Sequence, residues 1–347
     1  MKHELIPASG HYYKANLHNH TTVSDGRHTP EEIKAHYKAH GYSIVAFTDH
    51  DVMVPHPELN DENFLAITSY EVETNGEALG GTWMGVPTYH LNFYAKNPLE
   101  THYPCPNPGY CFGNGPAYAA EQPNYKGDYV RRYSVEGQNE MIAEAKRLGY
   151  LVSYNHPDWS LQHYNDYAGL EGFTALEVYN TGCVVEGYHL DTSDHVLDEF
   201  LNMGKRVFPV ATDDNHGDHD MCGGWVRFKA PALTYDAIMT AYERGDFYAS
   251  WGPEIEDLTL EDGILRVTCT PGPSGSPVTQ IVVSTGLRWR RVTMNEAGLT
   301  EATFDLTDYI SETRRTGIAD HAFFRLVLTD ARGDRALTRG YFIDELE

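Results

Sequence analysis

Two short segments near the N-terminus combine histidine and aspartate at spacings that suit metal binding. His18 and His20 follow an apolar run two residues apart, Asp25 comes in the next turn, and His50 ends a second apolar run. Side chains on a strand alternate between its faces, so residues at i and i+2 point the same way. Two imidazoles on one face are able to bind one divalent ion, and Asp25 and His50 are able to hold more metal nearby. The spacing therefore predicts a metal centre with imidazole and carboxylate ligands.

More candidate ligands recur at the ends of later apolar runs, and they are Glu71, His90, His156, Asp214 and His216. These runs alternate with helical segments, the first of which starts with Thr29 as N-cap, Pro30 in the first turn and Glu32 closing a capping box. About seven or eight strand–helix units over roughly 250 residues predict an α/β fold of the (β/α) barrel type. In such a barrel the carboxyl ends of the strands surround the active site.

The pattern changes after residue 252. Helical periodicity disappears, and residues 258–269 are typical of two strands joined by an Asp-Gly turn. We therefore predict a metallohydrolase barrel over residues 1–252 and a small all-β sandwich over residues 253–347. The sandwich carries no cluster of reactive side chains, so a stabilising or dimerising role is expected, and a homo-oligomer stays open.

Composition narrows the environment and the partners. The chain has 347 residues and a formal net charge of -24. Such an acidic surface repels nucleic acid, so a long nucleic-acid substrate is disfavoured. No apolar run is long enough to cross a membrane, and the first residues have no apolar signal core. The five cysteines include no Cys-x-x-Cys pair, and we expect reduced thiols in a cytoplasmic protein.

The motifs resemble those of the PHP (polymerase and histidinol phosphatase) superfamily over roughly residues 12–252. The segments that carry this resemblance are His18-x-His20, Ser24-Asp25-Gly26, Thr48-Asp49-His50-Asp51, Tyr70-Glu71-Val72, His90, Asn155-His156-Pro157 and Asp214-Asn215-His216. Residues 247–253, followed by a β domain, are similar to the stand-alone metal-dependent phosphoesterases of that superfamily. The resemblance implies a distorted (β/α)7 barrel with up to three metal ions.

The resemblance also implies how the ligands are shared. One ion would be held by His18, His20, Glu71 and Asp214, a second by Glu71, His90 and His156, and a third by Asp25, His50 and His216. Glu71 would bridge the first two ions; it is preferred over Glu73 on the register of the superfamily. Asp214 is preferred over Asp213 because Asp214-x-His216 keeps two ligands on one face. The superfamily often has histidine at the position of Asp25, though aspartate is common too, and this exchange could shift the metal preference or the occupancy of the third position.

The ligand types predict the chemistry. Imidazole and carboxylate without thiolate suit two or three ions of Mn, Zn or Fe. Two bridged ions create a hydroxide nucleophile and polarise a phosphoryl oxygen. Glu71 and Asp214 would take part in catalysis, Asp214 as general base. The leaving group would be protonated by His163 or stabilised by the third ion. We therefore predict a hydrolase of small phosphorylated metabolites. Hydrolysis of another ester, a carbamate or an amide, and a non-catalytic metal-binding module, remain alternatives.

Residues 96–133 form an unusual segment that is rich in proline and tyrosine. It follows the run that contains His90, so it is expected near the metal centre. One interpretation is a substrate-binding lid in which Lys126, Arg131 or Arg132 meets phosphate. The other is an ordered surface loop that packs on itself, or a subunit contact. The sequence leaves both open.

Overall fold

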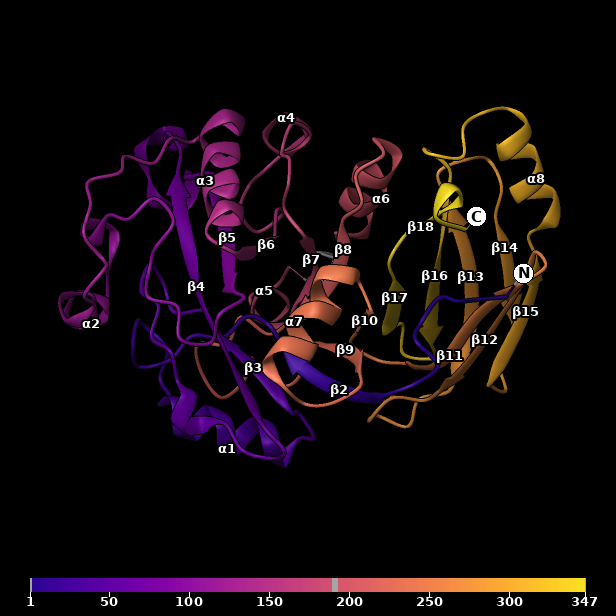
Figure 1. The fold of residues 1–347 in the computed structure, drawn as a ribbon, viewed down its shortest axis with the longest axis horizontal. Coiled ribbons are helices and arrows are strands. Elements are labelled where there is room, and N and C mark those ends of the chain that lie inside the picture. Colours follow the sequence, from indigo (N-terminus) through magenta and orange to yellow (C-terminus); the bar gives the residue numbers. More distant parts are fainter. Residues whose placement is uncertain (1, 189–192, 347) are drawn as a thin grey trace.

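The computed structural model describes residues 2–188 and 193–346. Within them, strands form one 14-stranded sheet and one four-stranded sheet, and helices lie around both (Figure 1). The mixed α/β class predicted from the sequence is confirmed. None of the helices in the described ranges is long and apolar enough to cross a bilayer.

A run of seven strands positions most of the candidate site. They are β2 (His11–Asn16), β3 (Ile44–Phe47), β4 (Leu65–Asn75), β5 (Thr88–Ala95), β6 (Tyr150–Tyr154), β7 (Ala175–Asn180) and β8 (Phe208–Thr212). Neighbours in this run pair in parallel except at β5, which runs antiparallel to both β4 and β6. β3 is entirely buried, as its continuous apolar sequence predicts.

The two ends of this run meet just beyond β2 and β8. Asn19 and Asn215 form a parallel bridge, and the Asp214 amide donates to the His18 carbonyl at 2.9 Å. On its other side β2 pairs antiparallel with β9 (Trp225–Ala230), which pairs with β10 (Phe247–Ser250). The described ladders therefore do not close a seven-stranded barrel, and the barrel stays a prediction.

Helices connect the strands of this run. The longer ones are α1 (Pro30–Ala39), α3 (Val135–Arg147) and α6 (Asp194–Asn202), and the short ones are α4 (Tyr164–Tyr167) and α5 (Thr181–Val185). Outside the run, α7 (Tyr235–Arg244) connects β9 to β10. α1 starts as predicted: the Thr29 side chain accepts from the Glu32 amide, and Glu32 accepts from the Thr29 amide. Ile33 and Tyr37 form its buried stripe. Single 3-10 turns are η1 (Pro57–Leu59), η2 (Leu79–Gly81), η3 (Trp83–Gly85) and η5 (Ile343–Leu346).

The C-terminal strands lie at the right of Figure 1. β11 (Glu254–Glu261), β12 (Ile264–Thr270) and β15 (Glu301–Asp305) form the small sheet together with β1 (Lys2–Glu4). β13 (Val278–Thr285), β14 (Arg291–Met294), β16 (Phe323–Asp330), β17 (Arg335–Thr338) and β18 (Tyr341–Phe342) extend the large sheet. This extension runs through the pairing of β10 with β17. The boundary at residues 252 and 253 stays a prediction, but hydrogen bonds of the sheet cross it.

The prediction of an all-β C-terminal segment is wrong at α8 (Thr307–Arg315). Only Tyr309 and Thr313 of this helix are buried, one turn apart. A polar helix with a single buried stripe of this kind has little apolar periodicity, which is why the sequence pattern did not reveal it.

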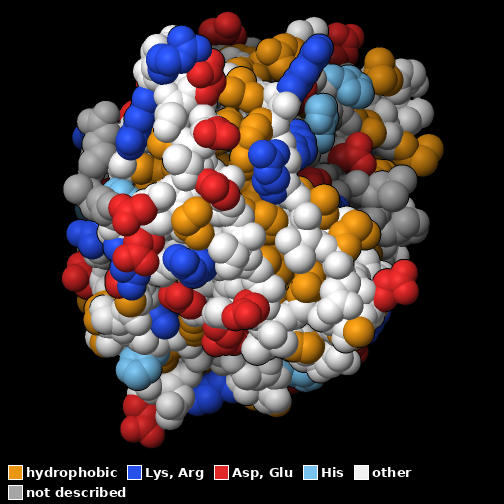
Figure 2. Space-filling view, turned by 90° about the vertical axis from the view of Figure 1, so that its right-hand side faces the viewer, with side chains coloured by type: hydrophobic (Ala, Val, Ile, Leu, Met, Phe, Trp, Pro, Cys, Tyr) orange, Lys and Arg blue, Asp and Glu red, His pale blue; other side chains and the backbone are white. Residues whose placement is uncertain are grey.

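The face turned to the viewer in Figure 2 mixes hydrophobic and charged side chains. The edge strand β14 exposes Val292 and Met294, and an exposed apolar edge of this kind is able to pair with another chain. The homo-oligomer remains a prediction.

Candidate metal centre

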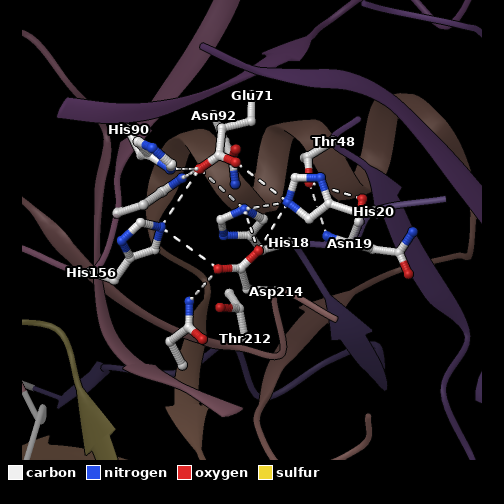
Figure 3. Close-up of polar contacts among 12 residues, drawn as sticks. His18, Asn19, His20, Thr48, Glu71, His90, Asn92, His156, Thr212 and Asp214 are labelled. Carbon is white, nitrogen blue, oxygen red and sulfur yellow. Dashed lines mark hydrogen bonds and ion pairs between the residues drawn. The ribbon is translucent and has the colours of Figure 1, made fainter. Parts of the chain in front are cut away.

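The predicted ligands converge on one edge of the seven-strand run (Figure 3). His18 and His20 follow β2, His50 follows β3, His156 follows β6, and Asp214 and His216 follow β8, all at carboxyl ends. Glu71 lies within β4 and His90 within β5. Because β5 runs antiparallel, the first half of that strand reaches this edge, so His90 does not end its strand as the sequence analysis expected.

The first cluster joins His18, His20, Glu71 and Asp214. Asp214 Oδ1 lies 3.1 Å from His18 Nε2 and 2.9 Å from His20 Nε2. Glu71 approaches the same two nitrogens, at 3.2 Å from His18 and 3.3 Å from His20. Four potential ligand atoms therefore face one point, and they come from three separate parts of the chain.

Glu71 also belongs to the second cluster, with His90 and His156. Its Oε1 lies 2.9 Å from His90 Nδ1 and 3.6 Å from His156 Nε2. His156 Nε2 lies 3.7 Å from Asp214 Oδ2, so Asp214 also reaches toward both clusters. A carboxylate between two sets of imidazoles is the arrangement of a bridging metal ligand. Glu73 lies farther out, with its Oε2 3.7 Å from His90 Nε2.

The third cluster contains Asp25, His50 and His216, and His20 joins it. Asp25 Oδ2 lies 3.6 Å from His216 Nε2 and 4.0 Å from His50 Nε2. The His20 ring stacks between those of His50 and His216, with centroids 4.2 Å from each. This cluster is looser and more exposed than the other two. All nine predicted metal ligands are thus brought together in adjoining clusters.

Two buried carboxylates that the sequence analysis did not single out hold the ligands in place. Glu177 in β7 accepts from His18 Nδ1 at 2.9 Å and from the His156 amide at 3.1 Å. A carboxylate on the far nitrogen of a ligand histidine orients the ring and fixes its tautomer. Asp49 accepts from the Thr21 and Ser24 amides and so shapes the turn that ends at Asp25. Neither contact leaves a signal in local sequence.

Asp213 and Asp214 face opposite ways. Asp213 is fully buried and its carboxylate accepts five hydrogen bonds, from Tyr37, Thr181, Cys222, Gly223 and Gly224. Asp214 has a left-handed backbone, with φ 51°, and points into the clusters. A non-glycine residue in this conformation is strained, and such strain concentrates at functional sites. Asp214 is therefore the residue of this pair placed to bind metal.

Electrostatics within the clusters is strongly coupled. Burial lowers the pKa of His20, but the Asp214 and Glu71 carboxylates outweigh it and raise the pKa to about 10. Burial also lowers the pKa of His90, while Glu71 and Glu73 raise it to about 10 overall. His50 shows the opposite net effect, because burial and neighbouring His20 lower its pKa to about 3. The buried carboxylates thus demand positive charge close by.

Several buried polar atoms in the clusters lack a hydrogen-bond partner, which is expected where side chains bind cations. The atoms that have no hydrogen-bond partner within the described residues include Glu71 Oε2, Asp214 Oδ1, His20 Nδ1, His50 Nδ1, His90 Nε2 and His156 Nε2. Buried polar groups normally find partners, so orphaned atoms that converge need another occupant. Because every one of them is a nitrogen or carboxylate oxygen, the residues fit divalent ions.

A cavity of about 350 Å³ opens over the clusters. Besides ligands it is lined by Arg27, Trp159, Val185 and His219, among others. Sequence reasoning missed Arg27, although it comes two residues after Asp25 and its amide donates to the His216 carbonyl at 3.1 Å. It is the only lysine or arginine among the described residues that line the cavity. Trp159 packs near His156 and His90, with centroid distances of 5.2 and 5.7 Å.

The remaining predicted site residues do not line this cavity. His163 is exposed at the start of α4, and Lys126 is exposed in the long loop. Arg132 pairs with Glu140 at the surface. Arg131 is buried in an ion pair with Asp51, and its second guanidinium nitrogen donates to the Glu73 carbonyl at 2.6 Å. The structure therefore gives none of these four the position that the sequence analysis expected.

Residues 96–133 pack largely on themselves. Within the segment lie two short helical elements, η4 (Pro108–Tyr110) and α2 (Gly115–Glu121). Tyr103 and Tyr125 are buried and stacked, with centroids 3.8 Å apart. Phe112 is the aromatic that reaches the clusters, with its ring 4.7 Å from that of His50. Most of the tyrosines thus act as core, and only Phe112 is placed like part of a lid.

No protein-family model matches the chain, and no curated protein matches it. Solved structures do resemble it. One is a two-domain protein containing a predicted PHP-like metal-dependent phosphoesterase from Bacteroides vulgatus, with TM-score 0.44, 14% identity and 85% of each chain covered. Another is a putative metal-dependent phosphoesterase from Bifidobacterium adolescentis, with TM-score 0.39, 19% identity, and 68% of this chain and 96% of that chain covered.

A third structure is an amidohydrolase from Chromobacterium violaceum, with TM-score 0.39, 15% identity, and 67% of this chain and 96% of that chain covered. PHP-like metal-dependent phosphoesterases are thus among the solved structures to which this chain is similar.

Proposed function

We propose that the protein is a metal-dependent hydrolase of small phosphorylated metabolites, acting as a phosphomonoesterase on a barrel-like scaffold. The observation that carries this proposal is the position of Glu71. Its two carboxylate oxygens face separate groups of imidazoles at the floor of a cavity of about 350 Å³. A bridging carboxylate under an open cavity is typical of catalytic metal centres rather than of closed structural ones.

Each cluster would hold one divalent ion, of Mn, Zn or Fe. Ions bound there would lower the pKa of a coordinated water toward neutrality and polarise a phosphoryl oxygen. Asp214 is placed to hold the proton of that water, and the Asn180 side chain, which donates to Asp214 Oδ2 at 3.1 Å, orients it. His219 lines the cavity, unlike His163, and is the histidine placed to protonate a leaving group.

Substrate recognition rests on Arg27 and on the shape of the cavity. A guanidinium binds phosphate through two parallel hydrogen bonds, so Arg27 is suited to fix a phosphoryl group above the clusters. Trp159 and Val185 offer an apolar wall to the leaving group. A cavity of about 350 Å³ fits a small ester, and the net charge of -24 disfavours a long nucleic acid.

A second candidate is the hydrolysis of a carboxylic ester, carbamate or amide at the same centre. The observation that favours it is the acidic rim, where Glu73 and Glu186 line the cavity without belonging to the metal-binding clusters. These carboxylates repel an anionic leaving group and tolerate a neutral or cationic one. We place either activity in the cytoplasm, since none of the five cysteines forms a disulfide.

The decisive experiment is a hydrolysis screen of protein reconstituted separately with Mn, Zn and Fe. Phosphate release is measured from nucleotides, sugar phosphates and amino-acid-derived phosphates, and acid release from carboxylic esters and amides. Glu71→Gln should abolish turnover with the fold retained, while Glu121→Gln at an exposed site should not. Turnover of phosphate-free substrates alone would select the second candidate. No turnover at all, from protein shown to contain its ions, would contradict both.

A further inference from the structure

A second group of metal-binding side chains lies outside the cavity. His36 lies in α1, His40 is the C-cap residue one turn further on, and Cys222 lies in the segment between β8 and β9. One ring nitrogen of each histidine and the Cys222 sulfur lie within 4.8 Å of one another. Residues at i and i+4 share one face of a helix, so the two imidazoles are presented together. None of the three residues lines the cavity described above.

The distances are close to those that a zinc ion requires. Bonds of about 2.0 Å to nitrogen and about 2.3 Å to sulfur in a tetrahedron separate the ligand atoms by roughly 3.3–3.8 Å. Small rotations of the His36 and His40 side chains would suffice, because both rings are at least partly exposed. Their rings are already stacked, with centroids 4.6 Å apart.

The orientation of His40 leaves one nitrogen available. Its Nδ1 lies 2.9 Å from the His36 carbonyl oxygen. A carbonyl oxygen only accepts, so Nδ1 carries the proton and Nε2 has the lone pair. A backbone carbonyl on one ring nitrogen is the usual way in which proteins prepare the other nitrogen for a metal.

Cys222 is held rigidly opposite the two rings. Its backbone is left-handed, with φ 65°, and its amide donates to Asp213 Oδ2 at 2.8 Å. The next residues are Gly223 and Gly224, yet this left-handed position carries a side chain, where glycine would be free of strain. Burial, followed by the charge of Asp213, raises the pKa of the thiol to about 12. A metal ion would have to displace the thiol proton.

We propose that His36, His40 and Cys222 form a zinc site that is separate from the catalytic centre, with water as the fourth ligand. Thiolate and imidazole are softer than the carboxylate-rich set of the cavity, so this site prefers zinc to manganese. His28 and Asp218, which pair at 2.7 Å, are the nearest charged groups acting on His36 besides His40.

The site would clamp α1 to the segment that follows β8. That segment carries Asp214 and His216. The Tyr37 hydroxyl of α1 lies 2.8 Å from Asp213 Oδ2 and 2.9 Å from Asn215 Oδ1 of the segment. Zinc bound to Cys222 would add a further link and would restrain this wall of the cavity. Its role is structural, so it does not depend on which bond the enzyme hydrolyses.

Cobalt substitution separates the two kinds of site. A Co²⁺ ion bound to thiolate absorbs in the near ultraviolet by charge transfer, and none of the nine ligands in the cavity clusters is a cysteine. We expect this band in the full-length wild-type protein, and its loss in Cys222→Ser. Cys105→Ser is the matched control, since Cys105 is also partly exposed, and it should keep the band. His40→Ala should weaken Zn²⁺ binding at least roughly tenfold.

A second measurement covers the case in which Cys222→Ser fails to fold. Alkylation of Cys222 in the wild-type protein is mapped by mass spectrometry with Zn²⁺, with Mn²⁺ and without metal. Zn²⁺ should protect Cys222 and Mn²⁺ should not, and the exposed substitution His40→Ala should remove the protection. No thiolate band in the wild type, a band that survives in folded Cys222→Ser, or equal alkylation with and without Zn²⁺ would overturn the proposal.

Discussion

The adjacent residues Asp213 and Asp214 offer a sharp test of the site, because the structure gives them different tasks. Asparagine is nearly isosteric with aspartate, so each substitution changes hydrogen bonding and charge but little volume. We expect Asp213→Asn to destabilise the fold while the metal ligands stay in place. We expect Asp214→Asn to weaken metal binding while the fold stays intact.

The expected loss in the free energy of unfolding for Asp213→Asn follows from the five hydrogen bonds that the Asp213 carboxylate accepts. One carboxylate oxygen accepts from Thr181, Gly223 and Gly224 at 2.6, 2.9 and 3.0 Å, and the other accepts from Tyr37 and Cys222, both at 2.8 Å. An amide replaces one oxygen by NH₂. Depending on its orientation, either the Cys222 amide or the Gly223 and Gly224 amides lose their acceptor, whereas the Tyr37 and Thr181 hydroxyls have Asn215 Oδ1 and the Thr212 carbonyl within reach. At about 1–3 kcal/mol for each unsatisfied group, unfolding should cost about 1–6 kcal/mol less.

The assay is urea unfolding of the metal-free variants, combined with metal titration of the folded proteins. Asp214→Asn removes a ligand that two clusters approach, so its metal affinity should fall at least 10–100-fold, roughly the loss seen when supporting contacts are removed. Asp213→Asn should keep its affinity once the protein is folded. The assignment is wrong if Asp213→Asn costs less than about 1 kcal/mol, or if it loses metal as severely as Asp214→Asn.

Three further outcomes are expected. Arg27→Ala should lower kcat/KM for a phosphate ester about 10–100-fold, the value of a charged hydrogen bond, with Arg27→Lys intermediate; an unchanged ratio in steady-state kinetics would remove Arg27 from the substrate site. Asp51→Ala leaves the buried Arg131 guanidinium unpaired and should cost about 3–5 kcal/mol in urea unfolding, much of which the double variant with Arg131→Met should recover. Chelation should lower Tm, since ions at 100 times Kd stabilise by about 2.7 kcal/mol, and a Tm unaffected by chelator would contradict bound metal.

Local elements of the fold could be predicted from the sequence where a few neighbouring residues determine a contact. The capping box of Thr29 and Glu32 marked the start of α1 because its partners are three residues apart. α8 escaped detection because a nine-residue helix with two buried side chains hardly differs from a polar loop. The pairings of β10 with β17 and of β1 with β11 join residues far apart in the chain, and no local pattern encodes them.

The candidate site divides in the same way. The proximity of His18 to His20 and of Asp214 to His216 was predicted from the period of a strand. In the structure both pairs follow their strands, and Asp214 has a left-handed backbone. Glu177 and Asp49 act through contacts to residues 159 and 25–28 positions away. Glu177 lies in no motif, and Asp49 lies in Thr48-Asp49-His50-Asp51, a motif that does not encode its contacts to Thr21 and Ser24. Arg131 is a residue to which the sequence analysis gave a role that the structure does not support. It was predicted to meet phosphate, but it is buried in an ion pair with Asp51.

The sequence by itself thus determined which side chains are candidate metal ligands, which strands most of them follow, and the preference for Asp214 over Asp213, because residue type and strand period are local properties. Only the tertiary structure decided which buried carboxylates orient the ligands, how Glu71 lies between two sets of imidazoles, and which cation reaches the cavity. Those features depend on how β4, β7 and the segment after β8 approach one another in space. The approach is set by the packing of the whole core, which no short stretch of sequence contains.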